Sequence, residues 1–181
     1  DWITVIDEQR ALFVDPAGRS GRVDMTVIVA DPGGLQARVP VTIDLVNLAP
    51  SAQPDTVAIA DAPVVVSPLS NDSDPDNDPI SLGAVPVSVE FANGEVGTIE
   101  QVGNGQLRID AGDGLGVGTF EYTIVDSLGL TSAPATVTVM VNRSPVAPTV
   151  PIEVEAGSSA VVPVPATDAE GGPLTLTILG D

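Results

Sequence analysis

Hydrophobic and polar residues alternate in short runs along most of this chain. In one such run, single residues separate the apolar side chains of Val23, Met25, Val27 and Val29. Apolar residues at every second position indicate a β-strand with one buried face. The runs are bounded by Gly, Pro, Asn and Asp, which are typical of turns. The pattern therefore predicts an all-β protein made of many short strands.

These criteria predict strands in three groups, separated by two proline-containing linkers. The first group comprises residues 2–6, 11–14, 23–29 and 39–45. The second comprises residues 56–60, 63–67, 80–85, 87–91, 98–102, 106–110, 119–125 and 135–141. The third comprises residues 152–156, 160–164 and 174–179. In addition, Gly103-Asn104-Gly105 predicts a tight hairpin between two strands of the middle group.

An internal repeat relates the three groups. Residues 95 positions apart match in pairs such as Leu12 with Leu107 and Asp31 with Asp126, and Asp74 matches Asp168 at a spacing of 94. Such self-similarity indicates tandem copies of one structural unit. We therefore predict the end of one repeat at residues 1–48, a complete β-sandwich at 49–143 and the start of another repeat at 144–181. The first residue is Asp1 rather than Met, so we expect a piece of a longer polypeptide.

Composition narrows the chemistry that this chain can perform. It has no Cys and no His, and all six of its basic residues are Arg. Thiol nucleophiles, imidazole bases and lysine amines are therefore missing, which argues against an enzyme. The net charge of −19 argues against nucleic acid and anionic membranes as partners, because both require a basic surface. The apolar runs are only strand-sized, so direct membrane insertion is not expected.

One acidic stretch, residues 71–80, concentrates negative charge in the middle group. Asp72, Asp74, Asp76 and Asp78 lie at alternate positions in it. Two carboxylates about 4 Å apart repel by about 1 kcal/mol in water, and by several times that at a protein surface. Two interpretations stay open at this point. The stretch is either a solvated acidic turn between strands or a calcium loop, since this cation takes several oxygen ligands.

The motifs together resemble those of a known family. The turn Asp31-Pro32-Gly33-Gly34 and the linker at 44–50 are similar to the end of a cadherin-like repeat. Residues 71–80 and 166–174 resemble the acidic loop that opens such a repeat. In order and spacing, the motifs resemble the tandem cadherin-like or Ig-like repeats of about 95 residues in large bacterial surface adhesins. The resemblance implies tandem Greek-key β-sandwiches that serve as a spacer or adhesion segment without enzymatic activity.

The resemblance also implies calcium ions (Ca2+) at the junctions between repeats. At the first junction the implied ligands are Asp44 and Asn47 of the linker, Asp74 and Asp76 of the acidic loop, and Asp126 of the closing turn, with Asp15 within reach. At the second junction they are Asp61, Asp168 and Glu170. Successive antiparallel strands independently place the loops at 71–80 and 126–130 at one end of a sandwich. Because the second linker contains Arg143 and no acidic residue, we expect weaker calcium binding there.

Two other functions compete with that of a spacer. One is an accessory β-sandwich that binds glycan or protein and is attached to an extracellular enzyme, and the other is a carboxylate hydrolase. The chain contains one Trp, one Tyr and three Phe, which is few aromatic residues for either kind of binding site. For the spacer, the expected partners are neighbouring repeats of the same polypeptide and other cell-surface proteins or glycans. Its expected location is extracellular or at the cell surface.

Overall fold

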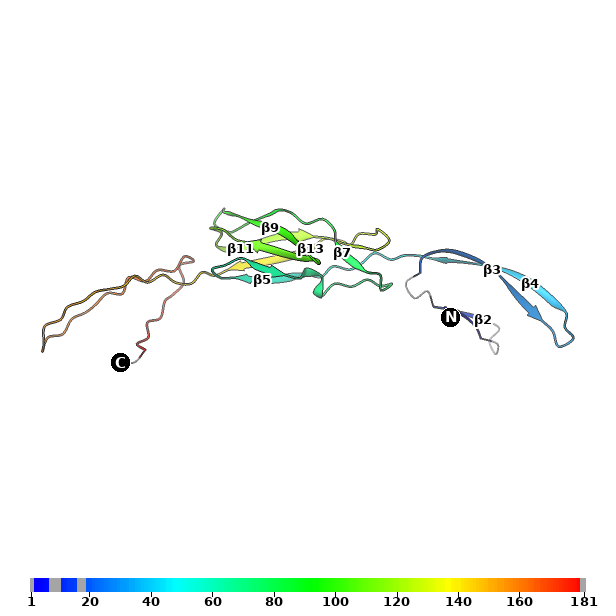
Figure 1. Cartoon of the computed structure of the whole chain (residues 1–181), viewed down its shortest axis with the longest axis horizontal. Coiled ribbons are helices and arrows are strands. Elements are labelled where there is room, and N and C mark those ends of the chain that lie inside the picture. The colour runs from blue at the N-terminus through cyan, green and yellow to red at the C-terminus, as the bar shows by residue number, and fades with distance from the viewer. Residues whose placement is uncertain (1, 7–10, 16–18, 180–181) are drawn as a thin grey trace. The chain divides into compact units, whose positions relative to one another are not determined.

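The structure, a computed structural model, describes residues 2–6, 11–15 and 19–179, which are built from β-strands and turns (Figure 1). Within these ranges, one short 3-10 helix at Pro68–Ser70 is the only helical element, and no helix is long and apolar enough to cross a membrane. The chain forms two units. The first consists of Asp1–Ala52, Leu69–Ala84 and Thr123–Pro134, and the second of Gln53–Pro68, Val85–Tyr122 and Ala135–Asp181.

The second unit contains a β-sandwich of two sheets. One sheet has the strand order β6 (Val64–Val66), β10 (Gln106–Asp110), β9 (Val96–Gly103) and β8 (Ser88–Glu90), all antiparallel. The other has the order β11 (Gly116–Tyr122), β13 (Ala135–Val141) and β5 (Asp55–Ile59), in which β5 runs parallel to β13. Because strands far apart in the sequence are neighbours in both sheets, the unit has the long connections typical of a Greek-key sandwich.

Apolar side chains from both sheets form the core of this sandwich. Leu107 and Ile109 of β10 and Val137 and Val139 of β13 are fully buried. They alternate with more exposed residues, as the sequence pattern predicts. Each buried side chain of this size stabilises the fold by about 1.5–3 kcal/mol. The sandwich is therefore held together mainly by aliphatic packing.

Tyr122 connects the start of the second unit to this core. Its ring is buried, and its hydroxyl group lies 3.0 Å from the carbonyl oxygen of Gln53 and 3.1 Å from Oδ2 of Asp55. A buried tyrosine hydroxyl requires such polar partners. The side chain thereby fixes the residues that lead into β5 against the sandwich.

The glycine-rich loop before β11 makes room for the ring of Phe91. Phe91 is buried, and a methyl group added at Gly114 would collide with its ring. A methyl group at Gly118 would lie 2.8 Å from the carbonyl oxygen of Glu90. Both glycines are therefore needed for close packing.

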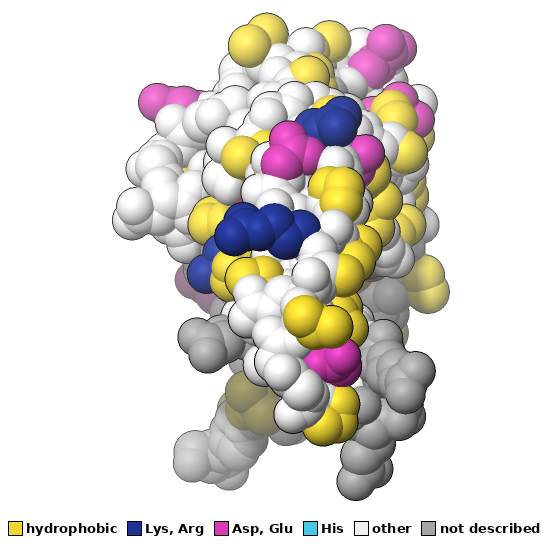
Figure 2. Space-filling view, turned by 90° about the vertical axis from the view of Figure 1, so that its right-hand side faces the viewer, with side chains coloured by type: hydrophobic (Ala, Val, Ile, Leu, Met, Phe, Trp, Pro, Cys, Tyr) yellow, Lys and Arg dark blue, Asp and Glu magenta, His cyan; other side chains and the backbone are white. Residues whose placement is uncertain are grey.

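The first unit contains three antiparallel strand pairs. They are β1 (Ile3–Ile6) with β2 (Ala11–Val14), β3 (Gly21–Ala30) with β4 (Gln36–Leu45), and β7 (Ile80–Leu82) with β12 (Ile124–Asp126). The β3–β4 hairpin leaves large apolar side chains exposed, among them Ile28, Val29 and Leu35. Figure 2 shows hydrophobic side chains at the surface among charged ones. No residue of β3 or β4 is fully buried, so this hairpin does not form a hydrophobic core of its own.

Most predicted strands are confirmed, and one group is wrong. All strands of the first two groups are present with small shifts at their ends, except that 119–125 is divided at Thr123 into β11 and β12. Residues 152–156, 160–164 and 174–179 form no strand. Their repeat equivalents are β5, β6 and β7, which pair with β13, β10 and β12. The 181 residues contain no copies of those partner strands for the third group. The division at residues 48 and 143 stays a prediction.

Candidate metal sites at the two linkers

The acidic loop folds around the carboxylate of Asp74. Its Oδ1 accepts hydrogen bonds from the N–H groups of Asp76 at 2.8 Å and Asp78 at 3.1 Å. Its carbonyl oxygen accepts the N–H of Asn77 at 3.2 Å. Asn77 has a positive φ of 60°, a conformation that asparagine tolerates better than most residues. The alternating aspartates therefore build a tight turn in which the Asp74 side chain is buried.

The linker that precedes the middle group is hydrogen-bonded to this loop. The N–H of Leu48 donates to Oδ2 of Asp76 at 2.6 Å. Ser51 and Ser73 exchange two backbone hydrogen bonds, of 2.7 and 3.1 Å. Linker and acidic loop are therefore side by side, as the predicted site requires.

Asp126 is a second buried carboxylate, in the closing turn after β12. Its Oδ1 accepts the N–H groups of Leu128 and Leu130, both at 2.9 Å, and its Oδ2 accepts Nδ2 of Asn47 at 2.7 Å. Burial acts to raise the pKa of Asp126. The hydrogen bonds from Asn47 and from the backbone of Leu130, Leu128 and Gly129 outweigh burial and hold the pKa below its ordinary value of 3.8. The carboxylate is therefore ionised at neutral pH.

Three oxygen atoms in this region are buried and accept no hydrogen bond: Asn47 Oδ1, Asp74 Oδ2 and Asp78 Oδ2. They are the only such side-chain atoms in the described part of the chain. A buried polar atom without a partner costs roughly 1–3 kcal/mol, and more when it is charged. Carboxylate and amide oxygens are also the ligands that calcium prefers. The chemistry of these residues therefore fits a hard divalent cation.

The described residues contain no cluster of three or more Asp, Glu, His or Cys side chains that could hold a metal ion in the present arrangement. The carboxylates would have to move together for an ion to bind. Asp78 is absent from the predicted ligands, although its place in the alternating acidic run was a signal for it. The structure adds it because its Oδ2 is buried without a partner.

Two predicted ligands of the first junction lie on the preceding hairpins. Asp44 is exposed on β4, opposite Arg22 of β3. None of the hydrogen bonds of the described residues brings Asp44 to Asp74, Asp76 or Asp126. Asp15 is exposed just after β2, and its N–H donates to the carbonyl oxygen of Trp2 at 2.7 Å. Their role as ligands stays a prediction.

The acidic residues predicted for the second junction also lie beside their linker, but protein donors already bind them. Ser144 donates its N–H to Oδ1 of Asp61 at 3.0 Å and its hydroxyl to Oδ2 at 2.6 Å. The N–H of Arg143 is shared by the carboxylate oxygens of Glu170, at 3.1 and 3.2 Å. Oδ1 of Asp168 accepts the N–H groups of Glu170 and Gly172, both at 3.1 Å. The hydrogen bonds from Ser144, with a smaller contribution from the Arg143 charge, lower the pKa of Asp61.

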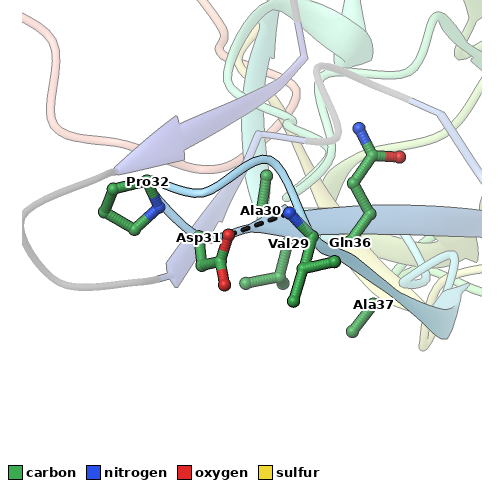
Figure 3. Close-up of a pocket in the computed structure, with 7 residues that line it drawn as sticks. Val29, Ala30, Asp31, Pro32, Gln36 and Ala37 are labelled. Carbon is green, nitrogen blue, oxygen red and sulfur yellow. Dashed lines mark hydrogen bonds between the residues drawn. The ribbon is translucent and has the colours of Figure 1, made fainter.

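The sequence repeat extends to individual hydrogen bonds. Oδ1 of Asp31 accepts the N–H of Leu35 at 2.8 Å (Figure 3). This bond matches the one from Leu130 to Asp126. A hollow of about 540 Å³ adjoins the Asp31 turn and is lined by residues 29–32 and 35–37. Asp31 is its single acidic residue, so it offers too few ligands for a metal site.

Comparison with known proteins identifies one family and several distant structures. The model of the bacterial cadherin-like domain family matches residues 47–143. No curated protein matches the chain. Among solved structures, PcdhgB3 EC1-4 is 20% identical, covers 94% of this chain and 48% of that chain, and has a TM-score of 0.41.

Two further structures are similar to the chain. Mouse clustered PcdhgC3 EC1-3 is 15% identical, covers 94% of this chain and 64% of that chain, and has a TM-score of 0.37. The endo-fucoidan hydrolase MfFcnA9 from glycoside hydrolase family 107 is 13% identical, covers 77% of this chain and 26% of that chain, and has a TM-score of 0.37. The chain thus spans 26% to 64% of the lengths of these three proteins.

Proposed function

Because the chain belongs to the family of bacterial cadherin-like domains, we propose that it is a spacer and adhesion segment of a larger secreted or cell-surface protein. The internal repeat supports this role, since turns around Asp31 and Asp126 share the same hydrogen bonds 95 residues apart. Repeats of this kind contact mainly their neighbours along the chain. Neighbouring repeats are therefore the expected partners, together with other cell-surface proteins or glycans at its ends.

The second part of the proposal is that calcium stiffens the first linker. One observation carries it, namely the three buried oxygens of Asn47, Asp74 and Asp78 that accept no hydrogen bond. A cation among them would offset the repulsion between the carboxylates and supply the missing electrostatic partner. Asp76 and Asp126 are the remaining acidic residues of this site. Asp76 accepts the N–H of Leu48, and Asp126 accepts Nδ2 of Asn47, so both are hydrogen-bonded to the linker. Binding would therefore fix the linker to the loop and the closing turn.

Thermal unfolding of the whole chain in calcium and in chelator tests this site. Extracellular modules bind calcium with dissociation constants of about 10⁻⁴ to 10⁻³ M. A concentration of 100 times the dissociation constant stabilises the folded state by about 2.7 kcal/mol. We expect calcium to raise the melting temperature of the native chain and to have little effect on the double variant Asp74→Asn/Asp78→Asn. Asparagine keeps the oxygen that accepts the loop hydrogen bonds, so the turn itself can still form.

The matched control is Glu100→Gln/Glu121→Gln, which removes the same charge from exposed positions on β9 and β11. This variant should keep the full response to calcium. Identical melting curves of the native chain in millimolar calcium and in chelator would contradict a stabilising site.

A further inference from the structure

Arg143 occupies the position in the second linker that Leu48 occupies in the first. The two residues are 95 positions apart, and both donate their N–H to the acidic loop that follows. Leu48 donates to Oδ2 of Asp76 at 2.6 Å, and Arg143 donates to both carboxylate oxygens of Glu170. The backbone contact is therefore the same, whereas an apolar side chain at one linker is replaced by a permanent positive charge at the other.

The Arg143 side chain connects the two sheets of the sandwich. Its Nη1 donates to the carbonyl oxygen of Ala60 at 2.9 Å, and its Nη2 donates to the carbonyl oxygen of Gly112. Ala60 follows β5 of one sheet, and Gly112 lies just beyond β10 of the other. A guanidinium group is always protonated and presents five donors in a rigid plane, so one side chain can hold several oxygen atoms. Carbonyl and carboxylate oxygens are also the groups that a calcium ion would bind.

The oxygens around this linker are satisfied without an ion. Ser144 donates two hydrogen bonds to Asp61, and the N–H of Arg143 binds Glu170. Within the ranges that the structure describes, the buried side-chain oxygens without a partner all lie at the first linker. The two linkers thus share a backbone arrangement. They differ in the groups that compensate the negative charge of their acidic residues.

We propose that the guanidinium group of Arg143 takes the place of a metal ion at the second linker, so that this linker keeps its structure when calcium is removed. The inference rests on the proposed function in one respect, because it treats residues 142–145 as a junction between repeats. The chain then carries two kinds of junction. Calcium controls the order of the first, whereas the second is held permanently by a side chain.

Hydrogen exchange of backbone amides in the whole chain tests this directly. The amides of Leu48 and Ser144 each donate to a carboxylate of their own junction, and so they report the two linkers separately. In the native chain, we expect the Ser144 amide to exchange at the same rate in millimolar calcium and in chelator. The Leu48 amide should exchange faster in chelator. In chelator, we expect the Ser144 amide of Arg143→Gln to exchange roughly tenfold faster than that of the native chain. The reason is that the loss of hydrogen bonds made by a charged group changes an equilibrium by a factor of about ten or more.

Two further variants separate charge from other effects. Arg143→Lys keeps the charge and should exchange more slowly at Ser144 than Arg143→Gln does. Arg38→Gln removes the same charge from an exposed position on β4 and should leave the Ser144 amide unchanged.

The inference is overturned if chelator accelerates exchange at Ser144 in the native chain. It is equally overturned if Arg143→Gln leaves that rate unchanged, or if Arg143→Lys is as fast as Arg143→Gln. If the Leu48 amide instead exchanges at the same rate in calcium and in chelator, that result contradicts the calcium site of the proposed function. It does not affect the conclusion drawn from Ser144.

Discussion

At the scale of single residues, Asn47 and Asp126 show how the first linker is tied to the sequence that follows it. The Asn47 amide nitrogen donates to Asp126, while its Oδ1 is buried without a donor. One side chain can therefore hold the turn and still offer an oxygen to a cation. This double use explains why an asparagine suits the position, since an aspartate would accept only and would repel Asp126.

The lowered pKa of Asp126 predicts a specific dependence of stability on pH. Its folded-state pKa lies below the ordinary value of 3.8, so its ionised form stabilises the fold above that pH. This contribution is lost as the pH falls through the lowered pKa. We expect Asp126→Asn to lower the melting temperature at neutral pH, and the difference from the native chain to shrink below about pH 3.8. Melting curves in calcium-free buffer measure this, and a difference that stays constant down to about pH 2 would contradict it.

At the scale of elements, the sequence predicts correctly those strands and turns that depend on residues close together in the chain. The bounds of β10 agree with the prediction because Leu107 and Ile109 alternate with more polar neighbours. The hairpin at Gly103-Asn104-Gly105 is confirmed, and both central residues have positive φ, 50° for Asn104 and 69° for Gly105.

Features that depend on distant partners were less predictable. The strands expected at 152–179 are wrong because a strand needs a neighbour to pair its backbone groups, and alternation says nothing about that neighbour. The contacts of Arg143 were missed for a similar reason, since they reach Ala60 and Gly112 in distant loops. The positive charge of Arg143 in the second linker was the signal, but from the sequence it predicts only weaker calcium binding there.

The packing of Phe91 against the glycine-rich loop gives a prediction at this scale. Gly114→Ala should destabilise the sandwich by roughly 1–3 kcal/mol, because overpacking forces the ring or the loop to move. Denaturant unfolding measures the change. In the background Phe91→Leu, which removes the ring, Gly114→Ala should reduce the stability clearly less. The stability changes caused by substitutions at two residues in contact are not additive. Equal costs in both backgrounds would show that the loop conformation, and not the ring, requires the glycine.

At the scale of the whole molecule, two properties oppose each other. The net charge of −19 keeps copies of the chain apart. Large apolar side chains are nevertheless exposed in the two flanking segments, with Leu35 at 76% and Val161 at 98% exposure. In the register of the sequence repeat, residues 144–181 correspond to the start of the repeat predicted at 49–143, and residues 1–48 correspond to its end. The two segments of different copies therefore have complementary patterns of apolar residues.

This balance predicts self-association that salt strengthens. Added salt shortens the screening length from about 10 Å at 0.1 M to about 3 Å at 1 M, which weakens the repulsion between copies but not the burial of apolar surface. We expect the mean mass in light scattering to rise with protein concentration, and to rise more steeply at high salt. Ile178→Ser/Leu179→Ser should reduce this rise, because both side chains are at least 90% exposed. Val87→Ser, which changes an exposed residue just before β8, should not. A strict monomer at every concentration and salt level would show that the charge prevails and that the exposed strands do not find partners.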